Sequence, residues 1–172
     1  MNKIRFGLIG SGWRAEFYIR IAKAVPERFE LTKVLIRDKE KGDAFGRRHN
    51  VQTVQTLDEL LADDPDYVVL SVKRGITSGY LERLFEQRIP VLCETPPAED
   101  ADSLNTLWEQ YKKYDAKVQI AEQYIEQPLY AAWDKVIREG RLGRIENINI
   151  SSLHGYHGAS MIRRFLDTGY EE

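Results

Sequence analysis

Two patterns of apolar and polar positions alternate between residues 4 and 122. Short, almost continuously apolar runs are typical of strands buried on both faces, and between them apolar residues recur every three or four positions, which indicates amphipathic helices. Strict alternation of strand and helix predicts an α/β fold, a doubly wound Rossmann domain with a parallel sheet. We assign six strands, at residues 4–9, 29–36, 51–55, 66–72, 89–94 and 116–122.

The helices between these strands each carry an apolar stripe that predicts a buried face. We assign the helices to residues 13–25, 38–49, 57–62, 76–87 and 97–114. In the first helix we expect the buried residues to be Phe17, Ile21, Ala22 and Val25. In the last helix we expect them to be Leu104, Leu107, Trp108 and Tyr111.

The pattern changes after residue 122. A further helix starts at Pro128, and its expected buried face consists of Leu129, Trp133, Val136 and Ile137. Residues 144–153 then alternate between apolar and polar, which predicts a strand with one face in water. Its apolar members are Ile145, Ile148 and Ile150.

We therefore expect two domains. Residues 1–123 form the Rossmann domain, and residues 124–172 hold a linker helix and an incomplete C-terminal domain, a truncated α+β segment. The alternating isoleucines need a facing layer that the remaining sequence scarcely supplies. We therefore expect the tail from Asn147 to be poorly ordered or covered by another copy of the chain.

Composition narrows the class of protein. The formal net charge of −2 provides no electrostatic footprint for nucleic acid or an anionic membrane. The single cysteine, Cys93, excludes an internal disulfide and fits a reducing compartment. The sequence shows neither a signal peptide nor an apolar run long enough to cross a bilayer, so we expect a cytoplasmic protein. We predict no metal site.

The turn after the first strand carries the most specific local motif, Gly10-Ser11-Gly12-Trp13-Arg14-Ala15, a G-x-G-x-x-A dinucleotide fingerprint. Gly10 permits the tight turn, Gly12 lets the backbone approach a pyrophosphate, and Ala15 lets the helix pack closely on the strand. Unpaired N–H groups at the helix N-terminus favour phosphate. We predict that these six residues bind the cofactor; the alternative is a glycine-rich turn without a ligand.

The end of the second strand bears on the choice between NAD and NADP. Ile36 falls where a dinucleotide fold usually has the acid that binds the ribose hydroxyls, and Arg37 follows it. Arginine at this place suits a ribose 2′-phosphate, so we favour NADP over NAD. Two alternatives stay open: Arg37 is a solvated loop residue, and Asp38 either reaches a ribose or caps the next helix.

The fourth strand ends at residues that should face the same crevice, because ligands bind at the carboxyl ends of parallel strands. Ser71 is expected to line the cofactor site there. Lys73 and Arg74 follow in a loop, where two cations could hold a phosphate or a carboxylate. The alternative is that they only solubilise the loop.

At Cys93-Glu94-Thr95-Pro96 the chain resembles the glucose–fructose oxidoreductase and inositol dehydrogenase superfamily (Gfo/Idh/MocA). The resemblance implies an NAD(P)-dependent oxidoreductase, acting on a sugar or polyol, with a Rossmann domain and a second domain that shapes the substrate pocket and often forms a homo-oligomer. It also implies that Glu94 and Pro96 shape the nicotinamide end of the site. The stretches that carry it are residues 4–15, 56–61, 91–96 and 136–145.

The departures from the family pattern concern catalysis. Thr95 stands where the family usually has a lysine beside the nicotinamide and the reacting hydroxyl. Lys73 is a candidate substitute. If Gly155-Tyr156-His157 matches the family's catalytic histidine, His157 is the base, and Leu153 stands at the position of the family's aspartate. The alternative is that His157 is an ordinary polar residue near a domain edge.

Three functions follow from these observations. The first is an NAD(P)-dependent oxidoreductase of a sugar- or polyol-like hydroxyl compound, which we expect to be inactive as this chain alone. The second is a non-catalytic relative that retains the dinucleotide but has lost the catalytic lysine. The third is a structural relative without a ligand, which the two glycines of the fingerprint disfavour.

Overall fold

The computed structural model describes residues 3–152 and 154–168. Its chain divides into two compact units, Met1–Ala121 and Glu122–Glu172, here called the first and second units. No helix within the described ranges is long and apolar enough to cross a membrane.

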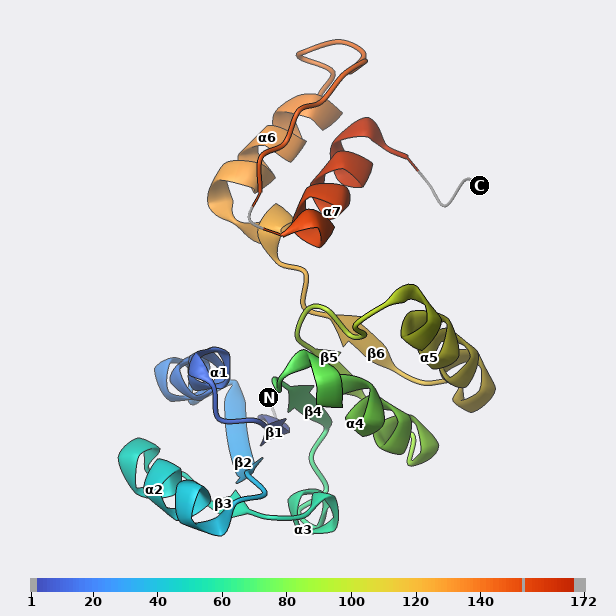
Figure 1. Ribbon diagram of the computed structural model, residues 1–172. Coiled ribbons are helices and arrows are strands. Elements are labelled where there is room, and N and C mark those ends of the chain that lie inside the picture. Colours follow the sequence, from blue (N-terminus) through green and yellow to red (C-terminus); the bar gives the residue numbers. More distant parts are fainter. Residues whose placement is uncertain (1–2, 153, 169–172) are drawn as a thin grey trace. The chain divides into compact units, whose positions relative to one another are not determined.

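The first unit is an α/β domain with strands and helices in alternation (Figure 1). The described residues form a six-stranded sheet in the order β3-β2-β1-β4-β5-β6, with every neighbouring pair parallel, which confirms the predicted fold class. The strands are β1 (Ile4–Ile9), β2 (Phe29–Leu35), β3 (Thr53–Val54), β4 (Tyr67–Leu70), β5 (Val91–Cys93) and β6 (Val118–Ile120). The helices are α1 (Trp13–Ala24), α2 (Lys39–His49), α3 (Leu57–Leu61), α4 (Arg74–Glu86) and α5 (Ala101–Tyr114).

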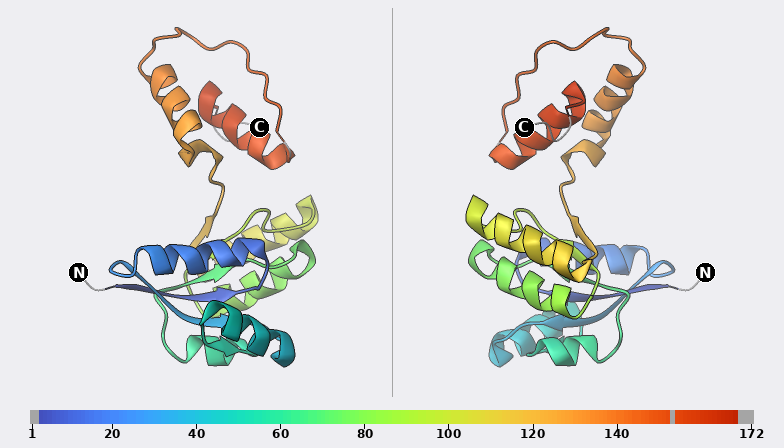
Figure 2. Two further views of the ribbon diagram at one scale, coloured as in Figure 1. Left: turned by 90° about the vertical axis from the view of Figure 1, so that its left-hand side faces the viewer. Right: turned by 90° about the vertical axis from the view of Figure 1, so that its right-hand side faces the viewer.

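Helices cover both faces of this sheet. Helices α1 and α2 lie on one face, and α3, α4 and α5 lie on the other (Figures 1 and 2). The central strands feed both cores: Val69 packs into the α1 side, whereas Val68 and Leu70 pack into the opposite side. All three side chains are fully buried, as expected for parallel strands that read as continuous apolar runs.

Local capping explains where two of the helices begin and end. The Asp38 side chain accepts a hydrogen bond from Lys41 N at 2.9 Å and starts α2, and Asn50 ends that helix in the left-handed conformation. Thr56 and Glu59 form a reciprocal capping box at the start of α3.

The predicted buried faces of α1 and α5 are partly wrong. Helix α1 buries Ala15, Ile19 and Ala22, whereas Phe17 and Ile21 are 40% and 44% exposed. Two of these three residues are alanines, because the helix approaches the sheet closely just after the glycine turn. In α5 only Leu107 is buried, while Leu104 and Trp108 are exposed.

The second unit contains η1 (Tyr124–Glu126), α6 (Pro128–Arg138) and α7 (Gly155–Leu166). Leu129 and Trp133 of α6 are exposed, contrary to the prediction, whereas Val136 and Ile137 are half-buried. The predicted strand over 144–153 does not form within 144–152, because a strand needs a pairing partner and the described residues supply none. Its three isoleucines are nevertheless half-buried between exposed neighbours.

Helices α6 and α7 are joined by a buried carboxylate. Arg164 donates from Nε and Nη2 to the two oxygens of Asp134, each at 2.9 Å, and Arg138 Nε donates to Oδ2 at 2.9 Å. The hydrogen bonds from Arg164, and then from Arg138, hold the pKa of Asp134 below its ordinary value against the opposing effect of burial. Such a paired carboxylate stabilises the unit only while it is ionised.

We expect Asp134→Asn to destabilise α6 and α7 at neutral pH by about 1.5–3 kcal/mol, because hydrogen bonds to a charged group are lost. Since the folded pKa lies below the unfolded value of about 3.9, the difference from wild type should persist above that pH and fade as the pH drops below it. Hydrogen exchange of the α6 and α7 amides measures this. Glu139→Gln, which alters an exposed residue of the same unit, is the control; an equal effect of both substitutions would contradict the prediction.

Candidate functional site

The turn between β1 and α1 is built tightly against the end of β4. Gly10 has a φ of +128°, and a Cβ placed on it would lie 1.9 Å from the carbonyl oxygen of Ser71. Hydrogen bonds from Gly10 N to Leu35 O at 3.2 Å and from Ser71 N to Ile9 O at 2.9 Å fix the turn between its neighbouring strands. Only glycine fits this position, for reasons of both conformation and space.

Gly12 occupies the opposite situation. It is the N-cap of α1 in an extended conformation, and a Cβ on it would meet nothing within 4 Å. Gly12 provides no side-chain cap for the helix, and the first N–H groups of a helix have no acceptor within the helix itself. Ala15 is completely buried beneath the same turn. The arrangement is suited to bind an anion that comes close to the backbone.

Trp13 and Arg14 extend the turn outward. Trp13 is 70% exposed and meets Phe17 edge to face, with ring centroids 5.7 Å apart. The Arg14 guanidinium lies 5.7 Å from the Trp13 ring centroid and 5.3 Å from that of Phe17. Ser11, between the two glycines, is half-buried.

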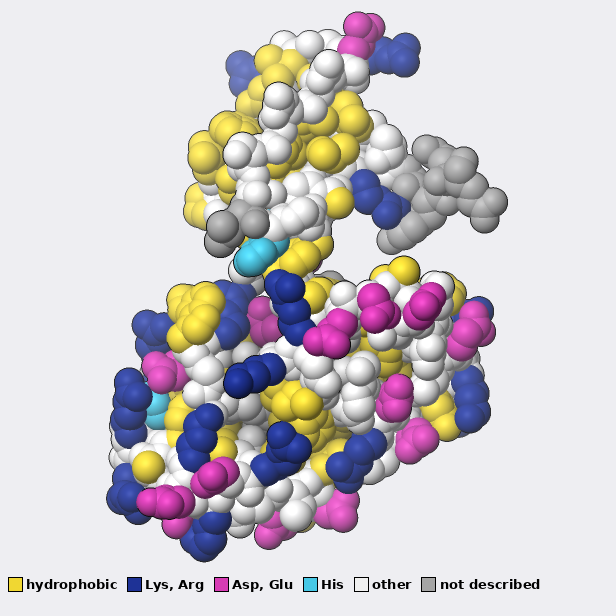
Figure 3. Space-filling view, in the orientation of Figure 1, with side chains coloured by type: hydrophobic (Ala, Val, Ile, Leu, Met, Phe, Trp, Pro, Cys, Tyr) yellow, Lys and Arg dark blue, Asp and Glu magenta, His cyan; other side chains and the backbone are white. Residues whose placement is uncertain are grey.

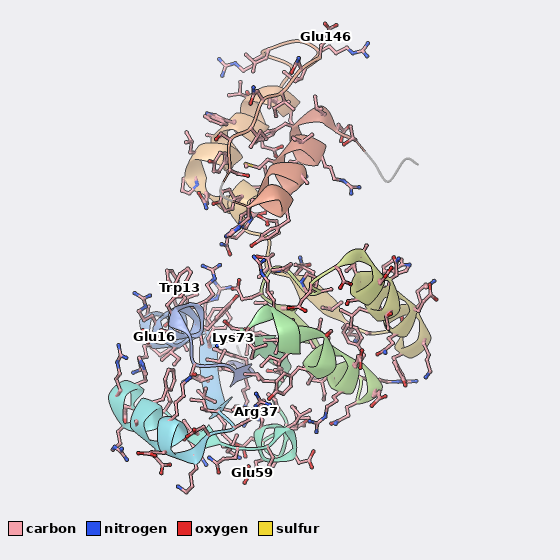
Figure 4. The ribbon with its side chains drawn as sticks, in the orientation of Figure 1. Trp13, Glu16, Arg37, Glu59, Lys73 and Glu146 are labelled. Atoms are coloured by element: carbon pink, nitrogen blue, oxygen red, sulfur yellow. The ribbon has the colours of Figure 1, made fainter. Side chains whose placement is uncertain are left out.

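The end of β2 presents a cation and no free acid. Ile36 is buried, and its N–H donates to Val54 O at 2.9 Å, so its side chain offers no acceptor to a ribose. Arg37 is exposed, and it lies on the same side of the first unit as Trp13 (Figure 4). Asp38 serves as the N-cap of α2. The sequence left open whether Asp38 reaches a ribose or caps the next helix, and the structure shows that it caps the helix.

The end of β4 contributes Ser71 and Lys73. Ser71 is buried, and its carbonyl contacts the Gly10 turn. Lys73 is exposed and is the N-cap of α4, which begins at Arg74 rather than at Ile76 as expected, so Arg74 and Gly75 are helical. Lys73 lies on the same face as Arg37 (Figure 4), where other basic side chains are also seen (Figure 3).

Glu94, Thr95 and Pro96 follow β5. Arg14 Nε donates to Glu94 Oε1 at 2.7 Å, and the Tyr18 hydroxyl donates to the same oxygen at 2.5 Å. Thr95 and Pro96 are half-buried and joined by a cis peptide bond. Burial raises the pKa of the neighbouring Cys93 thiol to about 12, so it stays protonated and is not a nucleophile.

The structure thus brings Gly10 next to Ser71 and Arg14 next to Glu94, and it places Arg37 and Lys73 on one face. Sequence reasoning missed Tyr18. The available signal was its four-residue spacing from Arg14, which puts both side chains on one side of a helix.

His157 belongs to the second unit and lies in the first turn of α7, a helix that the sequence analysis did not assign. Its Nδ1 is 2.6 Å from Glu122 Oε2, and its ring stacks on Tyr124 with centroids 4.1 Å apart. The imidazole is buried, so this is a carboxylate–histidine pair that the sequence did not reveal. Leu153, expected at the aspartate position, lies outside the described residues.

Comparison with known proteins shows the family to which the chain belongs. Residues 4–122 match the family model described as "Oxidoreductase family, NAD-binding Rossmann fold" (GFO_IDH_MocA). Inositol 2-dehydrogenase of Rhizobium meliloti (strain 1021) is 26% identical over 152 residues, 87% of this chain and 45% of that protein. D-xylose 1-dehydrogenase [NADP(+)] of Haloarcula marismortui is 24% identical over 147 residues, 83% of this chain and 41% of that protein. The chain spans less than half the length of these two relatives.

Solved structures share the fold. Scyllo-inositol dehydrogenase from Lactobacillus casei, with bound NAD(H) and scyllo-inositol, superposes with a TM-score of 0.81 at 16% identity, covering 96% of this chain and 57% of that one. The WlbA dehydrogenase from Bordetella pertussis, in complex with NADH and UDP-GlcNAcA, gives a TM-score of 0.74 at 23% identity, covering 84% and 44%.

Proposed function

Because this chain belongs to the Gfo/Idh/MocA oxidoreductase family with its NAD-binding Rossmann fold, we propose that it binds a nicotinamide dinucleotide across the carboxyl ends of its parallel strands. The observation that carries the proposal is the β1–α1 turn. Gly10 is locked against Ser71, while Gly12 leaves the uncapped start of α1 open. A pyrophosphate there would receive backbone N–H donors and the positive end of the helix dipole.

The sheet order supports a direction for the bound molecule. The strand order reverses between β1 and β4, and a dinucleotide lies across such a point with one half on each side. The adenosine half would then lie over β1 and β2, toward Arg37, and the nicotinamide half over β4 and β5, toward Lys73 and Glu94. Since the Ile36 side chain cannot accept hydrogen bonds from ribose hydroxyls and Arg37 can donate to a phosphate, we propose that NADP is preferred over NAD.

We further propose that the reaction is oxidation or reduction of a sugar- or polyol-like hydroxyl compound. The cofactor supplies hydride chemistry, and the protein supplies orientation and a place for the hydroxyl proton. Relatives named for inositol and xylose support this substrate class. Thr95 carries no amine, so we assign Lys73 to hold the reacting hydroxyl in its place. Within the second unit, we propose His157 as a proton acceptor at Nε2, because its Nδ1 lies 2.6 Å from the Glu122 carboxylate.

A second candidate is a dinucleotide-binding protein without turnover. The uncharged Thr95 at the position of the family lysine favours it.

Turnover assays with Lys73→Ala discriminate between the two candidates. From this chain alone we expect dinucleotide binding without appreciable turnover of sugars and polyols. Any turnover that does appear should be lost on Lys73→Ala, because a positioned proton-handling group contributes about 10²–10⁴-fold. The assay follows reduced nicotinamide absorbance with either cofactor, and Lys39→Ala, at an exposed lysine of α2, is the control. Turnover that is unchanged in Lys73→Ala would remove Lys73 from the site. Turnover that scales with the protein and is lost on Lys73→Ala would exclude the second candidate.

A further inference from the structure

Two donors from α1 converge on one oxygen of Glu94. Arg14 Nε lies 2.7 Å from Oε1 and the Tyr18 hydroxyl 2.5 Å from it. The side chains of Glu94 and Arg14 are only 14% and 24% exposed. Hydrogen bonds to an ionised acceptor in such partly buried positions are stronger than neutral ones, so α1 sets the orientation of this carboxylate.

The contact joins two segments that are distant in the sequence. Arg14 is in the first turn of α1, beside the Gly12 cap, and Tyr18 stands one turn farther along on the same side of the helix. The backbone of Glu94 is fixed from the sheet, since its N–H donates to Leu70 O at 2.9 Å. Helix α1, which starts at the β1–α1 turn, is therefore linked to the residues that follow β5.

Tyr18 is well suited to be a permanent donor in this contact. Burial raises the pKa of Tyr18 above its ordinary value, and the hydrogen bond to Glu94 raises it further. The phenol therefore stays protonated and keeps donating throughout the neutral pH range. The Oε1 atom of Glu94 already accepts these two hydrogen bonds, so the role we consider for Glu94 is to fix the orientation of the turn that it begins.

We propose that Arg14 and Tyr18 are positioning residues, which orient Glu94 and with it the Glu94–Thr95–Pro96 turn toward the nicotinamide half of a bound dinucleotide. The inference rests on the proposed function. It follows from the sheet order, because β5 lies on the side of the strand reversal opposite to β2 and Arg37. It predicts that loosening the contact affects one half of the ligand and spares the other.

A pair of ligands separates the two halves. NADH and ADP-ribose share the adenosine and pyrophosphate, and only NADH carries the nicotinamide. Isothermal titration of both ligands into wild type, Tyr18→Phe and Glu94→Gln measures the difference. Tyr67→Phe is the matched control, because it removes another half-buried hydroxyl of the first unit, at the opposite end of β4, while its stack on Phe6 can remain.

Tyr18→Phe should weaken NADH binding about tenfold, as expected for a lost hydrogen bond to a charged group, and leave ADP-ribose binding unchanged. Glu94→Gln should act in the same direction, and it decides the matter if Tyr18→Phe does not fold. Equal weakening of both ligands, no weakening of NADH, or an equal loss in Tyr67→Phe would overturn the inference. A folded wild type that binds neither ligand would instead refute the proposed function.

Discussion

Gly10→Ala is expected to destabilise the first unit by about 3–5 kcal/mol, the range of severe single substitutions. Two effects combine: alanine strains at the φ of +128°, and its Cβ would lie 1.9 Å from the Ser71 carbonyl oxygen. That oxygen belongs to backbone between β4 and α4, so relief requires β1 and β4 to separate. Urea unfolding followed by circular dichroism, together with hydrogen exchange of the β1 and β4 amides, measures the loss.

Gly12→Ala is the matched control for this prediction. Its φ of −80° is open to alanine, and its Cβ would enter empty space, so stability should fall by about 1 kcal/mol or less. Dinucleotide affinity should fall nevertheless, because the methyl group occupies the approach to the helix N-terminus. Similar stability losses in the two variants would show that the contact with Ser71 does not constrain the turn.

Arg37→Ala is expected to reduce NADPH affinity about 10–100-fold and to leave NADH affinity unchanged. A charge-assisted hydrogen bond is worth about 1.5–3 kcal/mol, and NADH has no 2′-phosphate to receive it. The described residues around Arg37 include no ion-pair partner, so the substitution breaks no salt bridge among them. Titrating both cofactors into the variant and into wild type measures the effect.

Arg47→Ala controls for net charge in this experiment, since Arg47 is an exposed cation in the last turn of α2, whereas Arg37 precedes the first turn of that helix. Its contribution to phosphate binding should be screened by salt. A wild-type chain that binds NADH and NADPH equally, or an NADPH preference that survives Arg37→Ala, would contradict Arg37 as the discriminating residue.

The parallel sheet was predictable because its signal is local. Each central strand is buried on both faces and therefore reads as a continuous apolar run, as Val68, Val69 and Leu70 do. The glycine turn was predictable for the same reason: the constraint on Gly10 is expressed in consecutive residues. The capping box of Thr56 and Glu59 likewise spans four positions.

Choices that depend on distant partners could not be predicted in this way. Helix α1 has two apolar stripes, and only the close approach of the sheet selects Ala15 and Ile19 over Phe17. The alternation at 144–152 has the period of a strand, but forming one requires a neighbour elsewhere in the chain.

The candidate site shows the same division. The fingerprint residues were identified from sequence, yet the contact of Arg14 with Glu94 joins positions 80 residues apart and depends on the order of the strands. The pairing of His157 with Glu122 across 35 residues was equally invisible. Helix α7 did carry a local sign that was missed, because His157, Met161 and Phe165 are buried at four-residue intervals.

The central claim is that the β1–α1 turn binds a nicotinamide dinucleotide, and equilibrium titration of NADPH and NADH into the folded chain tests it most directly. We expect saturable binding at one site in wild type, and marked weakening in Gly12→Ala at nearly unchanged resistance to urea. A folded wild-type chain that binds neither dinucleotide, or a Gly12→Ala variant that binds as tightly as wild type, would contradict it.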